Sequence, residues 1–501
     1  MFSERLLDEL LNAVRDPGTG NPLIGEADFK SSTFTGKANF DNSSFTGAAN
    51  FEGVTFNSDA RFQTAKFAGI AWFHRATFIG VAWFARARFS NTTWFREATF
   101  TDTAAFHQAT FAGHVWFLGA TSARDLWFSQ SKFETASILG PLVCAGTLDL
   151  YGAVFDAPVT IEAATIILMC QRTRWGSTAA LRLRYASVDL SDAVLEYPVS
   201  LMTRPDPFVK DAGTPLEEAI MAGAESGVRV VSLHGVDTAH LALSDVDLSM
   251  CVFTGTVHLD QLRLEGRVPF APVPPGTHRR GWRLVRFSPR RTLAEEQHWR
   301  AAQPSAVPGW ASASAGDAVV GPARLAPVYR SLRKAFEDGK NEPGAADFYY
   351  GEMEMRRADK EEPRAERWLL AAYWALSGYG LRATRALGWL IAAMAITIGV
   401  MMLWGLPAHD PKPVSTGTLS GQHITLTTET PDPVNPTGPL HERVSTDRFE
   451  KSLRVVVNSV IFRSSGQDLT TTGTYTEMAS RLAEPVLLGL AILAIRGRVK
   501  R

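Results

Sequence analysis

The residues whose side chains most often serve catalysis or metal binding are few and scattered in this sequence of 501 residues. The three cysteines, Cys144, Cys170 and Cys251, are odd in number and far apart, which predicts neither a zinc site nor a disulfide framework and suits a reducing compartment. The histidines are expected singly on the surface: His74, His107, His114, His234 and His240. The sequence contains no P-loop, no G-x-S-x-G and no H-E-x-x-H motif. It therefore predicts neither an enzyme nor a bound cofactor.

Tryptophan is the residue type whose spacing does suggest a function. Five tryptophans each stand directly before a phenylalanine, at steps of 11 residues with one gap at Ala105: Trp72, Trp83, Trp94, Trp116 and Trp127. If two such steps make one turn of a coil, three of them would stack on one face and two on the opposite face. Because rows of exposed tryptophan are costly, we expect them to contact a protein partner or a membrane. The alternative is that residues 270–377 of the same chain pack over them.

The tryptophans lie within a phenylalanine repeat that must position them. Between Ala27 and Phe133, two series of phenylalanines each advance in steps of 11; they hold 19 of the 29 phenylalanines, and Ser122 is the one break. A small residue such as Ala38 or Ser43 stands two positions before most of them, with a polar residue between. Spacings of 5 and 6 do not fit a helix, so this alternation predicts very short strands with phenylalanine inside. A fixed period of this kind is typical of a solenoid.

The motif A-(D/N)-F-x-x resembles the pentapeptide-repeat family in its phenylalanine-centred form. The resemblance implies a mainly β fold, a right-handed quadrilateral β-helix with about 22 residues in each coil and about five coils in this stretch. Some members of the family mimic DNA with an acidic rod. Between Glu26 and Glu134, however, 9 acidic residues face 10 basic ones, and the whole chain balances 51 against 51. We therefore expect no nucleic-acid partner.

Changes of pattern divide the chain into six regions. Leucine and valine replace phenylalanine after the regular repeats, and helical patterns follow a segment rich in proline and alanine. We expect an N-terminal capping helix over 1–22, regular coils over 23–138, degenerate coils over 139–269, a linker over 270–322, a helical linker with an interfacial helix over 323–380, and a membrane domain over 381–501.

The membrane domain is predicted from two apolar segments. Residues 386–406 contain no charge, and a helix of this length reaches about 32 Å, enough to cross a bilayer. A second span is expected at about 478–495, and a short helix at 449–462, too short to cross, lies between them. Arg382 and Arg385 precede the first span and a basic tail follows the second, so both ends of the chain are expected in the cytoplasm.

This order of segments resembles the two-helix pore domain of potassium-channel-like proteins. The helical linker, with Ser377-Gly378-Tyr379-Gly380, resembles that of bacterial pentapeptide-repeat proteins carrying such a module. In place of a T-x-G-Y-G-type filter, the candidate pore-loop region holds one glycine and an arginine: Arg463, Ser464, Ser465, Gly466, Gln467 and Asp468. A filter needs successive backbone carbonyls in conformations that glycine permits. We therefore expect a degenerate pore domain without potassium selectivity, in which the short helix dips into the membrane.

Together these patterns predict a multi-pass cell-membrane protein with a cytoplasmic β-helix. The preferred hypothesis is an interaction scaffold tethered to the membrane, whose partners are membrane lipid and a protein bound through the β-helix. The alternative is a homo-oligomeric ion channel in which the β-helix is a regulatory domain. A tetrameric state would favour the channel.

Overall fold

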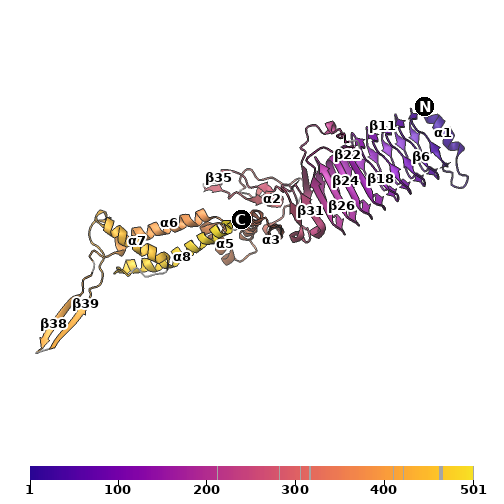
Figure 1. Cartoon of the computed structure of the whole chain (residues 1–501). Helices are drawn as coiled ribbons and strands as arrows, with labels where there is room; N and C mark the ends of the chain where they lie inside the picture. Colours follow the sequence, from indigo (N-terminus) through magenta and orange to yellow (C-terminus); the bar gives the residue numbers. More distant parts are fainter. Residues whose placement is uncertain are drawn as a thin grey trace. The chain divides into compact units, whose positions relative to one another are not determined.

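The computed structural model describes residues 1–210, 213–280, 283–304, 306–314, 318–409, 411–420, 423–461 and 466–499. The chain forms two compact units, Met1–Met355 and Arg356–Arg501. The first is a β-solenoid of about 11 turns with helices at its two ends, and the second is mainly helical (Figure 1). The predicted fold class, a pentapeptide-repeat solenoid followed by helices, is confirmed.

The phenylalanine-containing coils are built from strands of two residues. Ala71 pairs in parallel with Ala49 in the preceding coil and with Thr93 in the following one, so each coil holds 22 residues. Side chains on neighbouring coils are also 22 residues apart, as in the hydrogen bond from Arg75 to Glu97. Four strands complete a coil and give the solenoid four faces. The strands are β1 (Leu23–Ile24), β2 (Ala27–Asp28), β3 (Thr33–Phe34), β4 (Ala38–Asn39), β5 (Ser44–Phe45), β6 (Ala49–Asn50), β7 (Thr55–Phe56), β8 (Ala60–Arg61), β9 (Lys66–Phe67), β10 (Ala71–Trp72), β11 (Thr77–Phe78), β12 (Ala82–Trp83), β13 (Arg88–Phe89), β14 (Thr93–Trp94), β15 (Thr99–Phe100), β16 (Ala104–Ala105), β17 (Thr110–Phe111), β18 (Val115–Trp116), β19 (Thr121–Ser122), β20 (Leu126–Trp127) and β21 (Lys132–Phe133).

The later coils keep the same faces but contain longer strands. The strand β22 passes through three faces in a single coil, since it pairs in turn with β18, β19 and β20. The coil then shortens to 20 residues, because Val159 pairs with Ala179 and Ala179 with Val199. These strands are β22 (Ser137–Asp149), β23 (Val154–Phe155), β24 (Val159–Met169), β25 (Arg174–Trp175), β26 (Ala179–Arg184), β27 (Ser187–Asp189), β28 (Val194–Leu195), β29 (Val199–Thr203), β30 (Val228–Ser232), β31 (Leu241–Ser244), β32 (Val246–Asp247) and β33 (Arg263–Glu265).

An insert between β29 and β30 interrupts the later coils. It contains a short 3-10 turn, η1 (Ala219–Met221). Its apolar side chains Phe208, Leu216 and Met221 are buried together with Val143 and Ala164, which point outward from the solenoid. The insert therefore covers one face locally. Two more 3-10 turns, η2 (Thr238–His240) and η3 (Leu259–Gln261), lie in the last coils.

Phenylalanine fills the interior of the regular coils, as the repeat predicts. The ring of Phe73 is fully buried and stacks 4.9 Å from both Phe51 and Phe95. It meets the rings of Phe62 and Phe84 edge-on at 5.6 and 5.4 Å. Burial of one such ring stabilises the fold by roughly 1.5–3 kcal/mol. Each coil thus supports the next through columns of rings.

The N-terminal end is closed by the helix α1 (Glu4–Ala13). Ser3 is its N-cap, since the Ser3 hydroxyl accepts a hydrogen bond of 3.3 Å from a backbone N–H of the first turn. Leu7 and Leu11 are buried in the solenoid core. The backbone N–H of Phe2 donates a hydrogen bond of 2.8 Å to the first coil, so part of the exposed strand edge is paired.

The opposite end is closed by residues predicted to be a linker, and the structure corrects that prediction. Within 270–322 lies a helix, α2 (Ala294–Ala301), whose first turn caps the last coil. The Glu295 carboxylate accepts hydrogen bonds from the backbone N–H groups of Phe253 and Thr254, at 2.5 and 3.0 Å. The same segment also contains β34 (Ala271–Pro272), β35 (Thr277–Arg280), β36 (Arg283–Arg286) and β37 (Arg291–Thr292).

Three charged residues of this segment, Arg290, Glu295 and Glu296, are buried rather than solvated. Glu296 is fully buried and forms ion pairs with Arg290 at 2.5 Å and with Arg300 at 2.6 Å. It also accepts a hydrogen bond from the hydroxyl of Tyr329. Burial raises the pKa of Glu296, but the two arginine charges outweigh burial and lower the pKa to about 2. Sequence composition does not distinguish such internal pairs from a solvated loop.

Two helices complete the first unit and lead into the second. They are α3 (Pro322–Asp338) and α4 (Glu342–Ala358). The second unit contains α5 (Arg364–Ser377), α6 (Ala383–Val400), the π-helical turn η4 (Met401–Gly405), β38 (Val414–Ser420), β39 (His423–Glu429), η5 (Leu440–Arg443), α7 (Thr446–Val460) and α8 (Thr471–Val499). The helix α6 packs along α8, and α7 contacts both.

Candidate functional site

Three of the five predicted tryptophans lie side by side on one face of the solenoid. Trp72 pairs with Trp94, and Trp94 with Trp116, each one coil further along. The rings of Trp94 and Trp116 stack at 5.5 Å. The other two tryptophans belong to a second face, where Ala105 separates Trp83 from Trp127. That they bind a partner remains a prediction.

Part of the tryptophan row is bordered by the chain itself, through the insert between β29 and β30. Trp94 and Trp116 line a hollow of about 620 Å³ together with Arg204, Phe208 and Lys210 of the insert. The insert thus borders part of the row. The exposed fraction of Trp127 reaches 37%.

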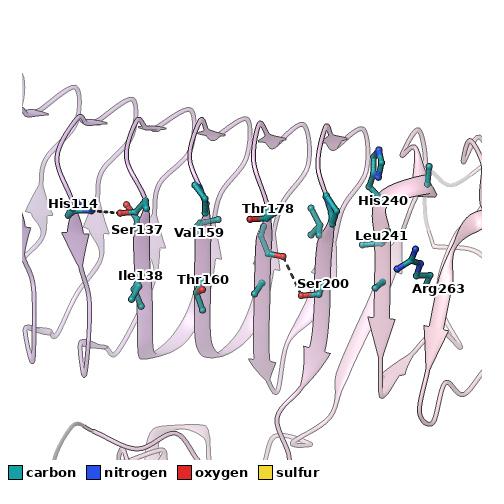
Figure 2. A pocket seen from close by; sticks show the side chains of 18 of the residues that line it. His114, Ser137, Ile138, Val159, Thr160, Thr178, Ser200, His240, Leu241 and Arg263 are labelled. Atoms are coloured by element: carbon teal, nitrogen blue, oxygen red, sulfur yellow. Dashed lines mark hydrogen bonds between the residues drawn. The ribbon is translucent and has the colours of Figure 1, made fainter.

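Beyond Trp116 the same face continues as a groove. Moving along the solenoid, the outward positions paired in register are Trp116, Ile138, Thr160, Ala180, Ser200, Ala242 and Arg263. Small side chains in the middle of this row leave a volume of about 620 Å³. Figure 2 shows the row from Ile138 to Arg263 along successive strands. The groove therefore arises where large outward residues give way to small ones.

One wall of the groove is formed by the corners that precede these strands. Pro158, Thr178 and Pro198 occupy equivalent corners in three consecutive coils. At the two ends of this wall stand His114 and His240 (Figure 2). His114 Nδ1 lies 2.6 Å from the carbonyl oxygen of Ala136, as the dashed line in Figure 2 marks. Hydrogen bonds between neighbouring coils hold these corners in place, as from the backbone N–H of Val159 to the carbonyl of Thr178.

The groove carries basic groups but no carboxylate. Its lining includes Arg263, His114 and His240, and no aspartate or glutamate. Among the described residues Arg263 forms no ion pair and its side chain is exposed. Of the carboxylates two residues from the lining, Glu162 pairs with Arg182 at 2.9 Å. Glu265, two residues beyond Arg263 on β33, is exposed and forms no ion pair among the described residues. The lining itself therefore carries basic side chains and no carboxylate, and its arginine stands at one end.

The three cysteines lie in the interior of the solenoid. Cys144, Cys170 and Cys251 are free and buried, and burial raises the pKa of Cys144 to about 11 and those of the other two as well. Within the described ranges, no three histidine, cysteine, aspartate or glutamate residues come together in a way that could hold a metal ion. The interior therefore contains inert thiols.

In the second unit, two helices are long and apolar enough to cross a membrane. They are Ala383–Gly405 and Thr471–Arg496. The first begins three residues before the predicted span 386–406 and the second seven residues before the predicted 478–495, so the sequence underestimates the second helix. Its N-terminal turns carry Glu477 and Arg481, which interrupt the apolar pattern. Large side chains on these helices stay exposed, as Ile391 and Ile396 do at 66% each.

The short helix α7 begins beside the end of the first span and ends beside the interior of α8. At its start, Arg448 donates hydrogen bonds of 2.8 and 3.0 Å to the carbonyls of Met402 and Leu406, at the end of the first span. At its other end, the hydroxyl of Ser480, well inside α8, donates to that of Ser459 at 3.0 Å. The chain then returns to the beginning of α8. This is the course of a helix that dips between two longer ones.

The candidate pore-loop region lies only partly within the described residues. Arg463, Ser464 and Ser465 lie outside them. Gly466, with φ of 67°, Gln467 and Asp468 form irregular backbone before α8.

Sequence reasoning missed one buried polar contact between the two apolar helices. Glu484 is fully buried and accepts a hydrogen bond of 3.0 Å from the hydroxyl of Thr397. Its second carboxylate oxygen has no partner among the described residues. Acidic residues within apolar helices are costly and usually face other helices. A threonine such as Thr397 is common in helices, so the sequence alone could not indicate that it would pair with Glu484.

Comparison with known proteins identifies the class of the first unit. Residues 23–66 and 62–107 match the family model of pentapeptide repeats (9 copies), and these residues form the first coils of the solenoid. No curated protein and no solved structure matches the chain. The protein thus contains a pentapeptide-repeat β-solenoid, followed by helices of which two could cross a membrane.

Proposed function

We propose that this protein is a non-catalytic interaction scaffold that is anchored in a cell membrane and binds a partner protein through its solenoid. The observation that supports this most is the presence, in one chain, of a groove along six coils and a pair of apolar helices. A solenoid can present a long surface because each coil is stabilised by its contacts with the neighbouring coils. Anchoring would concentrate that surface at the membrane.

The proposed orientation places the solenoid in the cytoplasm. Arg382 and Arg385 stand at the start of the first apolar helix, and positive charge favours the cytoplasmic side. The guanidinium of Arg385 lies 5.0 Å from the ring centre of Trp374 on α5. The same helix exposes Trp368 and Leu369, at 77% and 70%. Aromatic and basic side chains together suit the interface between lipid and water.

Membrane fractionation tests the anchor. The full chain is expected in the membrane pellet after extraction at alkaline pH. Replacing the exposed Ile391 and Ile396 by arginine puts two charges on the lipid-facing side, and we expect most of that variant to be released. The matched control replaces Ile424 and Leu426 of β39 by arginine, since these two residues are about equally exposed but lie outside the apolar helices. This control variant should stay in the pellet. A wild-type chain in the soluble fraction would refute the anchor.

A second candidate is a homo-oligomeric ion channel, and the course of α7 favours it. A short helix that dips between two apolar helices, as Ser459 and Ser480 indicate, is the arrangement of a two-helix pore domain. Such a pore requires several copies, so the mass of the purified complex decides between a tetramer and a smaller state. We expect no conductance or a poorly selective one in planar bilayers, because a filter sequence is missing. A reproducible preference for potassium over sodium would favour the channel over the scaffold.

A further inference from the structure

We infer that the groove binds an extended, acidic polypeptide segment, with an apolar residue at its Trp116 end and carboxylates at its Arg263 end. This inference rests on the proposed scaffold function and specifies the partner of the same surface. It draws on three properties of the groove: its length, its smooth floor and the uneven distribution of charge along it.

The length of the groove fits an extended chain. Seven outward positions from Trp116 to Arg263 give six steps between coils. At about 4.8 Å per step this row is about 29 Å long. An extended polypeptide advances about 3.3 Å per residue, so about nine residues would fill it. A small anion or a single sugar would occupy only a fraction of this length.

The floor of the groove accepts a chain without dictating its sequence. Its middle is lined by Thr160, Ala180 and Ser200, and no large side chain interrupts it. The two-residue repeat of an extended peptide is longer than the spacing between coils, so a bound peptide cannot match every coil in register. Selectivity must therefore come from the two ends of the groove.

The ends differ in chemistry. At one end, Trp116 and Ile138 offer apolar surface, and Ile138 is 38% exposed. At the other end, Arg263 is exposed and has no ionic partner among the described residues, with His240 also lining the groove. An arginine without a partner suits a carboxylate, which it can bind through two parallel hydrogen bonds.

Charges in the groove lining favour an acidic partner over a basic one and disfavour a polyanion. Three carboxylates beside the wall already have partners: Glu134 and Asp156 pair with Lys132 at 3.0 and 3.1 Å, and Glu196 with Arg174 at 2.8 Å. Glu265, beyond Arg263, is outside the lining. One free arginine and two histidines could not neutralise a nucleic-acid strand of this length, which would need a phosphate contact at almost every step. A polypeptide with one or two carboxylates matches the charge available.

The test is a charge exchange with defined peptides on the full-length protein in detergent. The probes are fluorescein-labelled peptides of nine residues, with leucine at one end, two glutamates at the other and serine and alanine between, made in both chain directions. Fluorescence anisotropy should show saturable binding of one direction. Arg263→Glu should weaken binding at least five-fold, and a probe with lysines in place of the glutamates should regain affinity for that variant. The matched control is Arg88→Glu on another face, which is also exposed; it should bind like wild type.

A second variant keeps the test independent of charge. Ala180→Phe fills the floor and should reduce binding of the glutamate probe at least five-fold without changing the far-UV circular dichroism. Equal binding to wild type, Arg263→Glu and Ala180→Phe would overturn the inference, as would no binding to wild type. Competition by a nine-nucleotide single strand but not by the peptide would overturn it in favour of a nucleic-acid groove. Membrane fractionation is separate from these readouts, so a failed anchor and a failed peptide site are distinguishable.

Discussion

The phenylalanine-filled coils and the later coils share four faces but fill and present them differently. In the first set, strands have two residues and each coil 22; in the second, strands are longer and the coil shortens to 20. One aromatic column crosses the boundary, since Phe133 stacks on Phe155 at 4.6 Å and Phe155 on Trp175 at 4.7 Å. The comparison shows that coil-to-coil pairing maintains the fold while the interior filling changes.

The outward residues make the functional difference between the two sets. On the same face, Trp94 and Trp116 of the regular coils stack and fill the surface. Thr160, Ala180 and Ser200 of the later coils leave a groove. The same backbone thus carries a filled face in one set of coils and a groove in the other, depending on the size of one outward side chain in each coil.

The largest expected effect comes from removing interior filling. Phe73→Ala deletes a ring that six others contact, and should lower the free energy of unfolding by about 3–5 kcal/mol. Leu181→Ala in the later coils, where the side chain is also fully buried, should fall toward the lower end of about 2–5 kcal/mol. Urea unfolding of the full chain, followed by circular dichroism, measures both. Equal and small losses would contradict the stacked-ring account of the regular coils.

The two end caps should differ in their response to pH. The pKa of Glu296 is about 2 in the folded protein against an ordinary value of 4.5, so its stabilisation is full above pH 4.5 and is lost as the pH falls toward 2. This contribution is on the order of 3 kcal/mol. Comparing wild type with Glu296→Gln by urea unfolding at pH 7 and pH 3 isolates it, because Glu295, whose pKa burial raises, is present in both.

The outcome at the N-terminal cap is the control. Leu7→Ala removes an apolar contact of α1 and should destabilise by about 2–5 kcal/mol at both pH values. A difference between wild type and Glu296→Gln that did not shrink from pH 7 to pH 3 would show that the carboxylate does not stabilise the C-terminal cap through its charge.

The tryptophan row should matter less for stability than for association. The ring of Trp94 is half-buried and stacks on that of Trp116. Trp94→Ala removes this ring and should lower the free energy of unfolding by about 1–2 kcal/mol. Thr160→Ala, at the equivalent position of the later coils, should change stability by less than about 0.5 kcal/mol. Thermal unfolding compares the two variants. A loss above about 3 kcal/mol for Trp94→Ala would make the row structural and remove the reason to regard it as a contact surface.

The smallest effect concerns the break in the phenylalanine series. Ser122 is buried, and its hydroxyl has no hydrogen-bond partner among the described residues. Ser122→Ala should therefore be neutral or stabilise by up to about 1 kcal/mol. Ser131, equally buried, donates a hydrogen bond of 2.6 Å to the carbonyl of Phe106, so Ser131→Ala should destabilise by about 1 kcal/mol. The same cost at both positions in denaturant unfolding would contradict this contrast.

The sequence predicts the position of a residue when that position follows from the repeat period or from a local rule. It does not predict the position when it depends on a contact with residues outside the local pattern. The period of the phenylalanines alone predicts Phe73 inside and Trp72 outside, and the cap at Ser3 follows from local rules. The groove could not be predicted because it depends on the register between coils of unequal length. The burial of Glu296 depends on Arg290 and Arg300, and no local pattern encodes that contact.

Site-directed labelling tests the account most directly, because it asks whether the two apolar helices place the solenoid and the β38–β39 hairpin on opposite sides of a membrane. Thr427 in the hairpin and Lys66 in the solenoid are both exposed, and the three native cysteines are buried. With an impermeant maleimide, Thr427→Cys should react in intact cells, and Lys66→Cys only after the membrane is opened. Reaction of both cysteines in intact cells, or of neither until lysis, would contradict the membrane-anchored scaffold.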